Sequence, residues 1–200
     1  MLTRILAVCA AVICSGLIAV GANLPLFTGP QDPSQLLAVA NQLIQSVNTG
    51  VTGNLAAATA DGATTATTAE VTLQTYSLPA NQLSANGQGL RVQCWGTTGA
   101  NSNNKTMKLY FGATSITTVA AASNAQGWFL RYVLTRRTAT TQAMNGEGVA
   151  GTAAVTVVAT TSQSPTENLA AAVTIKCTGT NGTASASDIT AAGMIVEQMK

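Results

Sequence analysis

The side chains that most enzymes use for proton transfer are scarce in this chain of 200 residues. It contains no histidine, the commonest general base and metal ligand, so Ser-His and Cys-His nucleophile pairs are excluded. The seven acidic residues stand singly: Asp32, Asp61, Glu70, Glu147, Glu167, Asp188 and Glu197. No two of them have the spacing of a carboxylate dyad, so a hydrolase built on Glu147 and Asp188 has no support. We therefore predict that the chain is not an enzyme and binds no cofactor.

The four cysteines form two groups. Cys9 and Cys14 lie in the apolar N-terminal run, where we interpret them as small hydrophobic residues. Cys94 and Cys177 each lie in an apolar, strand-like run. They could form a disulfide if their strands were neighbours, but we favour buried free thiols. A zinc site would need clustered cysteines or histidines, so we predict no bound metal.

Two tryptophans and a basic cluster are the remaining candidates for contacts with a ligand. Trp95 and Trp128 could stack on a sugar ring, but each lies at one end of an apolar run. We therefore favour burial of both in the core over ligand stacking. Arg131, Arg136 and Arg137 form the basic cluster, which we interpret as solvated side chains.

The composition favours a protein that is packed among neighbours. Charged residues make up 8% of the chain, whereas about a quarter is usual in soluble domains. A surface with so few charges is weakly solvated and suits contacts with other subunits. The net charge of +2 is too small to direct the chain to nucleic acid, so we expect no such partner. The length allows one sizeable domain with an appendage.

The appendage begins with residues 1–22, where one arginine precedes a mainly apolar run from Ile5 to Val20. A basic start, an apolar stretch and a small-residue end are typical of a secretory signal peptide. The alternative is a retained apolar helix that anchors the chain in an assembly. The run is shorter than the roughly twenty residues of a membrane span, so a membrane is a partner only if this segment anchors there.

Residues 23–50 are predicted to form an extended, proline-rich connector followed by a helix. Asp32 and Pro33 would open the helix as its N-cap and first helical residue. Apolar residues then recur at helical spacing as far as Val47, which gives the helix one apolar face. That face would dock on its own domain or in a multi-chain helical bundle. The residues that we assign to assembly or anchoring are Leu24, Leu26, Phe27, Leu36, Leu37, Leu43, Ile44 and Val47.

In the remainder of the chain the composition and the spacing of apolar residues change twice. Residues 51–69 are rich in Ala, Thr and Gly and are predicted to be a linker. From residue 70 to 200 the apolar period becomes two, and about eight or nine strands are predicted between Gly- and Asn-rich turns. No helical stretch is long enough for a parallel crossover. The expected fold is mainly β: an antiparallel, jelly-roll-like β-sandwich, preceded by an apolar segment and a short amphipathic helix.

Several of these runs resemble a family of small structural proteins from tailed-bacteriophage virions. The resemblance lies in LPANQL, GLRVQCWGTT and NNKTMKLYFG within residues 76–112. It continues in VTIKCTGTNGTASASDITAAGMIVE at residues 173–197. The connector NLPLFTGPQDPSQLLAVANQLIQSVNTGV at residues 23–51 is similar to a phage N-terminal attachment segment. These matches consist of turns and strand patterns, and residues 1–22 depart from them.

The resemblance implies a β-sandwich that decorates the capsid, projects from it as a head fibre, or forms part of the tail. It further implies a location in the virion, a homo-oligomer that is commonly a trimer, and the major capsid protein or a tail protein as partner. The alternative is a tail-associated or secreted surface module that binds carbohydrate, exported through the N-terminal signal.

Overall fold

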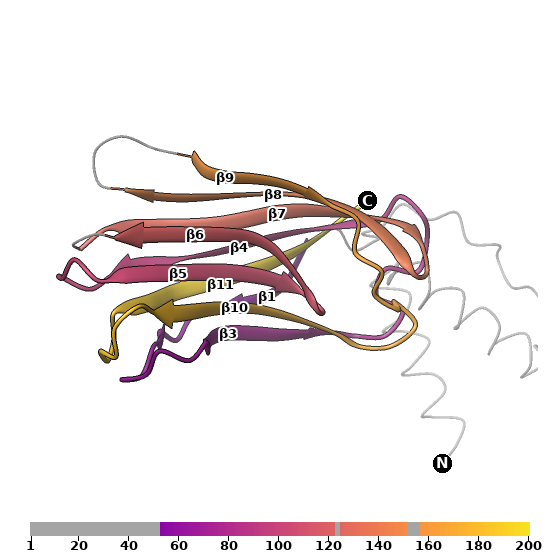
Figure 1. Ribbon diagram of the computed structural model, residues 1–200. Helices are drawn as coiled ribbons and strands as arrows, with labels where there is room; N and C mark the ends of the chain where they lie inside the picture. Colours follow the sequence, from indigo (N-terminus) through magenta and orange to yellow (C-terminus); the bar gives the residue numbers. More distant parts are fainter. Residues whose placement is uncertain (1–52, 123–124, 152–156) are drawn as a thin grey trace, which may run out of the picture. The chain divides into compact units, whose positions relative to one another are not determined.

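The computed structural model describes residues 53–122, 125–151 and 157–200 (Figure 1). This part of the chain is mainly β, with two antiparallel sheets. None of its elements is a helix long and apolar enough to cross a membrane. The predicted apolar segment 1–22, the connector and helix of residues 23–50 and all eight assembly residues lie outside the described ranges.

The larger sheet has the strand order β1-β11-β4-β7-β8-β9, and β2 also pairs with β11. All of these pairings are antiparallel. Strands far apart in the sequence are neighbours here, since β11 lies between β1 and β4. The strands are β1 (Gly53–Ala58), β2 (Gly62–Ala63), β4 (Gly89–Thr98), β7 (Gly127–Thr138), β8 (Thr141–Gly151), β9 (Val157–Gln163) and β11 (Ile189–Met199).

The smaller sheet has the order β3-β10-β5-β6, again with antiparallel neighbours. Its strands are interspersed along the chain with those of the larger sheet, so the chain passes repeatedly from one sheet to the other (Figure 1). The strands are β3 (Val71–Leu78), β5 (Asn104–Phe111), β6 (Thr114–Ala122) and β10 (Val173–Asn181).

The two sheets contribute to one buried core. In the larger sheet, alternate residues of β7 such as Leu130 and Leu134 are fully buried. In the smaller sheet Leu109 and Ile175 are equally buried, and all four belong to the same apolar cluster. Because side chains alternate between the faces of a strand, the period of two in the sequence directs one apolar face of each sheet into this core. The predicted mainly β, antiparallel fold is confirmed.

The structure differs from the sequence prediction in the stretch 51–69, which was expected to be a linker. Residues 53–58 form β1 and residues 62–63 form β2, and both pair with β11. Ala56 and Ala58 of β1 also pack against the core. Alanine and glycine favour strands weakly, so local propensity gives no sign of β1. Backbone pairing with β11 stabilises the strand and overrides that propensity.

The expectation of free thiols at Cys94 and Cys177 was wrong. The two residues form a disulfide with a Cα–Cα distance of 6.5 Å, and neither is exposed to solvent. Cys94 comes from β4 of the larger sheet and Cys177 from β10 of the smaller one, so the bond links the two sheets through the core. Both cysteines lie at inward positions of strands, as the sequence pattern indicated. That pattern could not reveal which strands of the two sheets lie opposite each other.

Candidate functional site

The face of the larger sheet that points away from the core gathers polar and aromatic side chains from four strands. Directly opposed residues of antiparallel strands share a face, and so do residues two apart on one strand. Trp95 lies opposite Phe129, and Gln93 lies opposite Arg131. Their chain neighbours Cys94 and Leu130 point the other way and are fully buried. We call this surface the outer face; its residues are Arg91, Gln93, Trp95, Phe129, Arg131, Val133, Asn145, Glu147, Gly193, Ile195 and Glu197.

The indole ring of Trp95 lies over β11 at the position of Gly193. A Cβ atom at Gly193 would be 2.5 Å from Cζ2 of the ring, 2.9 Å from Cη2 and 3.0 Å from Cε2. These distances are too short for any side chain, so a glycine at this position allows the ring to rest on the strand. Trp95 is half-buried as a result. One side of the ring is covered by protein, and the residue retains exposed surface on the outer face.

The two tryptophans therefore have different positions. Trp128 is 3% exposed, belongs to the core, and donates a hydrogen bond from Nε1 to the carbonyl oxygen of Thr97 at 3.2 Å. Core burial, which we favoured for both, describes Trp128. Trp95 instead points to the outer face beside Phe129. Because the side chains alternate in and out, residues 95 and 128 are on opposite sides of the sheet although their strands are paired.

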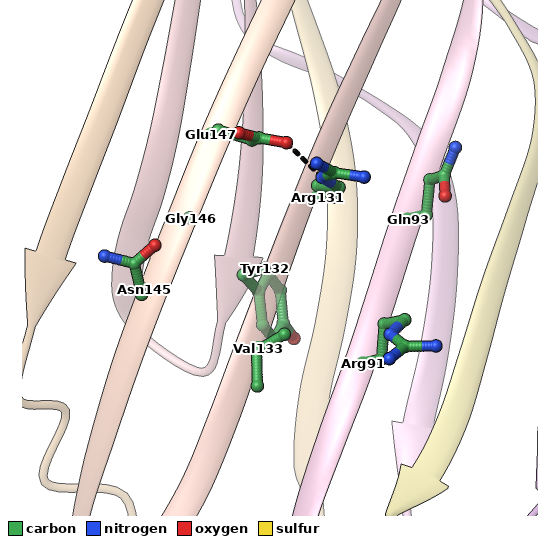
Figure 2. A pocket seen from close by; sticks show the side chains of 8 residues that line it. All are labelled: Arg91, Gln93, Arg131, Tyr132, Val133, Asn145, Gly146 and Glu147. Atoms are coloured by element: carbon green, nitrogen blue, oxygen red, sulfur yellow. Dashed lines mark ion pairs between the residues drawn. The ribbon is translucent and has the colours of Figure 1, made fainter.

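A shallow groove of about 450 Å³ runs along the outer face over β4, β7 and β8, and neither Trp95 nor Phe129 is among the residues that line it. Figure 2 shows the three neighbouring strands that form it: β4 with Arg91 and Gln93, β7 with Arg131 and Val133, and β8 with Asn145 and Glu147. Tyr132 and Gly146 complete the lining. The walls offer amide, guanidinium and carboxylate groups, which together donate and accept hydrogen bonds.

The charges of the outer face are arranged in two ion pairs. The Nε atom of Arg131 contacts Oε1 of Glu147 (Figure 2), and Nη1 of Arg91 lies 3.5 Å from Oε2 of Glu197. The arginine side chains are 57% (Arg91) and 55% (Arg131) exposed, so these pairs add little to stability. Their effect is to cancel the charge of the face. The guanidinium of Arg131 also lies 5.7 Å from the ring centroid of Phe129.

The basic cluster predicted from the sequence is divided by the fold. Arg131 belongs to the groove, whereas Nη1 of Arg136 donates a hydrogen bond to the carbonyl oxygen of Leu83 in a loop. Arg137 is exposed. The three side chains therefore do not form a common anion site.

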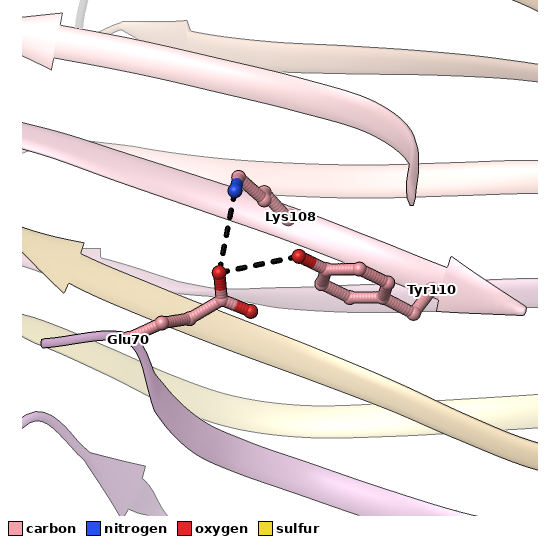
Figure 3. Close-up of polar contacts among 3 residues, drawn as sticks. All are labelled: Glu70, Lys108 and Tyr110. Atoms are coloured by element: carbon pink, nitrogen blue, oxygen red, sulfur yellow. Dashed lines mark hydrogen bonds and ion pairs between the residues drawn. The ribbon is translucent and has the colours of Figure 1, made fainter. Parts of the chain in front are cut away.

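A second polar cluster lies at the smaller sheet and joins the start of β3 to β5 (Figure 3). Nζ of Lys108 and the hydroxyl of Tyr110 both donate to Oε2 of Glu70, each at 3.2 Å. Burial pushes the pKa of Glu70 upward, but hydrogen bonds from Tyr110, Thr178 and Lys108 and the charge of Lys108 together lower the pKa overall. Nζ of Lys176 lies 4.6 Å from the ring centroid of Tyr110. These contacts tie strands together across β10.

A third polar cluster closes one end of the domain around Lys105, which is fully buried. Nζ of Lys105 donates to the side-chain oxygen of Asn101 at 2.8 Å and to the carbonyl oxygens of Asn101 and Asn103 at 3.1 and 3.0 Å. The side-chain amides of Asn101 and Asn103 in turn donate to the carboxylate of Asp188. Asp188 is thus held in this network and Glu147 in the Arg131 pair, so the fold does not combine them into a catalytic dyad.

The third cluster predicts a loss of stability in acid. Burial alone would raise the pKa of Asp188, but hydrogen bonds from Asn103 and Asn101 and the charge of Lys105 lower it below its ordinary 3.8. The stabilisation is therefore complete above pH 3.8 and is lost as the pH falls through the lower pKa of the folded state. We expect the free energy of unfolding, measured with urea from about pH 6 down to about pH 2, to decrease in acid.

The Asp188→Asn variant should show a flatter pH dependence over the same range. Asp61→Asn, at an exposed position, is the matched control and should follow the wild-type curve. If Asp188→Asn kept the full wild-type slope, the acid sensitivity would have to come from other carboxylates.

Among the described residues, no group of three or more Cys, Asp or Glu is placed to hold a metal ion. The chain matches no protein-family model and no curated protein sequence.

Sequence reasoning missed the outer face as a unit. The alternation Arg91, Gln93, Trp95 indicates that these three share a face, and Phe129, Arg131, Val133 do the same. Nothing in either run shows that the two strands are neighbours, or which residues of one strand lie opposite which residues of the other. No pattern in the sequence indicates the role of Gly193, because a lone glycine in a strand is equally compatible with a β-bulge or with the close approach of another group to the backbone.

Proposed function

We propose that this chain is a non-enzymatic structural protein of a tailed-bacteriophage virion, in the manner of a capsid-decoration or head-fibre protein. Its residues 70–200, extended by β1 and β2, would form a jelly-roll-like β-sandwich displayed on the particle. Residues 1–50 would attach it to the major capsid protein or a tail protein, with a homotrimer as the assembling unit. The proposal combines the sequence resemblance with the distribution of apolar side chains along the chain.

The observation that carries the proposal is this distribution. Where the structure describes side-chain exposure (residues 53–115, 125–151 and 162–200), Val133, 43% exposed, is the one large apolar side chain left exposed. The sequence of residues 23–50, in contrast, concentrates apolar residues at helical spacing. Since exposed apolar surface drives association, attachment is assigned to the N-terminal region and display to the β domain.

The jelly-roll-like assignment is supported by the connectivity. Two antiparallel sheets contribute to one core, and early strands pair with late ones: β3 with β10, and β4 with β11. Such non-local pairing is what Greek-key and jelly-roll connections produce. The disulfide between β4 and β10 would fasten the two layers of the sandwich.

Deletion of residues 1–50 tests the proposal. Virions are purified from cells that express either the full chain or the deletion variant, and bound protein is quantified by mass spectrometry. The full chain should co-purify with particles, whereas the shorter chain should be soluble and folded but absent from them. Particle binding that persists in the shorter chain would refute the division of roles. A full chain absent from the particles would refute the virion assignment.

The second candidate function is a tail-associated or secreted surface module that binds carbohydrate. The observation in its favour is the position of Trp95 on the outer face, which also holds the polar groove. N-terminal sequencing of the mature protein separates the two routes. A start at Asn23 would indicate export, and an intact Met1 would indicate assembly in the cytoplasm.

A further inference from the structure

We propose that the outer face binds an uncharged oligosaccharide, with Trp95 as the stacking surface and Gln93, Asn145 and the Arg131–Glu147 pair as hydrogen-bonding groups. The site depends on the β domain alone. It would operate on a capsid, on a tail or in a secreted chain; it rests on the second candidate function, carbohydrate binding, and names the ligand class and the residues of that site.

The stacking surface is set by Trp95 and Gly193. The apolar face of a sugar ring presents C–H groups, which pack favourably against the electron-rich face of an aromatic ring. The glycine supports the indole ring from one side, so the ring is fixed without losing all of its exposed surface. Phe129, opposite Trp95 in the strand register, is also half-buried, and the guanidinium of Arg131 lies 5.7 Å from its ring centroid.

The polar groups lie one step along the same strands. Gln93 precedes Trp95 by two residues, so the two side chains are about 6.6 Å apart along the strand, on the same face. Arg131 is opposite Gln93, and Glu147 is opposite Arg131 on the next strand. The indole ring leans onto β11 while the groove lies over β4, β7 and β8, so a sugar stacked on Trp95 would have its neighbouring unit cross β4 beside Gln93 to reach this row of amide, guanidinium and carboxylate groups. These groups match hydroxyls, which both donate and accept hydrogen bonds.

The charge of the face selects an uncharged ligand. Both arginines of the groove already contact a carboxylate, Arg131 with Glu147 and Arg91 with Glu197. A sugar acid would have to displace these partners and would meet their negative charge, whereas a hydroxyl can bind to the intact pairs. The groove volume of about 450 Å³ falls in the range of small-ligand sites. An open groove lined by amide, guanidinium and carboxylate groups favours a short stretch of glycan chain.

The test screens the full chain on a printed array of neutral and acidic oligosaccharides. The best neutral ligand is then titrated by calorimetry and by tryptophan fluorescence. We expect binding to neutral glycans and a change in fluorescence that is retained in Trp128→Phe. Trp95→Ala should weaken binding at least tenfold, and Gln93→Ala should weaken it several-fold by removing one or two hydrogen bonds.

Arg137→Ala, an exposed change on β7 that does not line the groove, is the control and should bind as the wild type does. Gly193→Ala tests separately whether Gly193 has to support the indole ring of Trp95, because the added methyl group displaces the ring while the tryptophan is kept. Thermal unfolding confirms that each variant is folded. The proposal is overturned by an array without bound glycans, by binding to acidic glycans alone, or by equal affinity of Trp95→Ala, Gln93→Ala and wild type. Trp95→Ala should still be incorporated into virions, so failure of this site is distinguishable from failure of the virion proposal.

Discussion

Reduction of the Cys94–Cys177 disulfide is expected to lower the free energy of unfolding by about 4 to 5 kcal/mol, as loop-closure entropy predicts for so long a loop. The bonded residues are 83 positions apart in the sequence, so the bond removes much of the conformational freedom of the unfolded chain. A loss of this size is a large part of the ~5–15 kcal/mol that stabilises a typical domain. The reduced protein should therefore unfold at a much lower urea concentration.

Because both cysteines are fully buried, the reduced sample is best prepared by unfolding the protein in denaturant with dithiothreitol and then refolding it. Urea unfolding with and without the reductant gives the difference in free energy. The double variant Cys9→Ser and Cys14→Ser is the control, since it removes the two other thiols. It should respond to reduction as the wild type does. Identical unfolding curves for oxidised and reduced protein would show that the bond contributes nothing.

Replacement of the buried lysine, Lys105→Met, is expected to destabilise the domain by roughly 3 kcal/mol or more, the range seen when one partner of a buried charged network is removed. The methionine keeps most of the apolar stem but removes the ammonium group. Two backbone carbonyls and the side-chain oxygen of Asn101 would then lose a buried donor. Asp188 would also lose the nearby positive charge that lowers its pKa.

Lys108→Met on the same strand provides the matched control. The side chain of Lys108 is 31% exposed and its partner Glu70 remains accessible to water. Loss of that ion pair should cost less than about 1 kcal/mol. Chemical denaturation of both variants gives the comparison. Equal losses in the two variants would show that burial of Lys105 does not determine its contribution.

The sequence allowed the class of fold to be predicted because the evidence for it is local. Period-two patterns such as Leu90–Cys94 and Val173–Cys177 indicate strands that are apolar on one face, and both are strands in the structure. The turns between them, rich in Gly and Asn, argued against helices. The absence of a crossover helix in the sequence pointed to antiparallel sheets, which is the arrangement found.

The features of the fold and of the site that could not be predicted from the sequence all depend on which strands are neighbours. The disulfide requires β4 and β10 to face each other across the core, and the groove requires β4, β7 and β8 to be adjacent in one register. Trp95 and Cys94 are consecutive residues with opposite environments, and which of them is buried depends on the face that the other sheet covers. The strand β1 is stabilised by its partner and not by its alanines. Each of these features arises from long-range pairing.

The position of β11 has a consequence for biosynthesis. This strand is translated after every other described strand, yet it lies between β1 and β4 and pairs with both. Until residues 189–199 have left the ribosome, β4 has one unpaired edge and β1 has no partner in the sheet. Unpaired edges are where other chains add and aggregation begins. The larger sheet therefore cannot be completed before this last described strand has emerged, and the slow, non-local closure gives the nascent chain a period in which it needs protection.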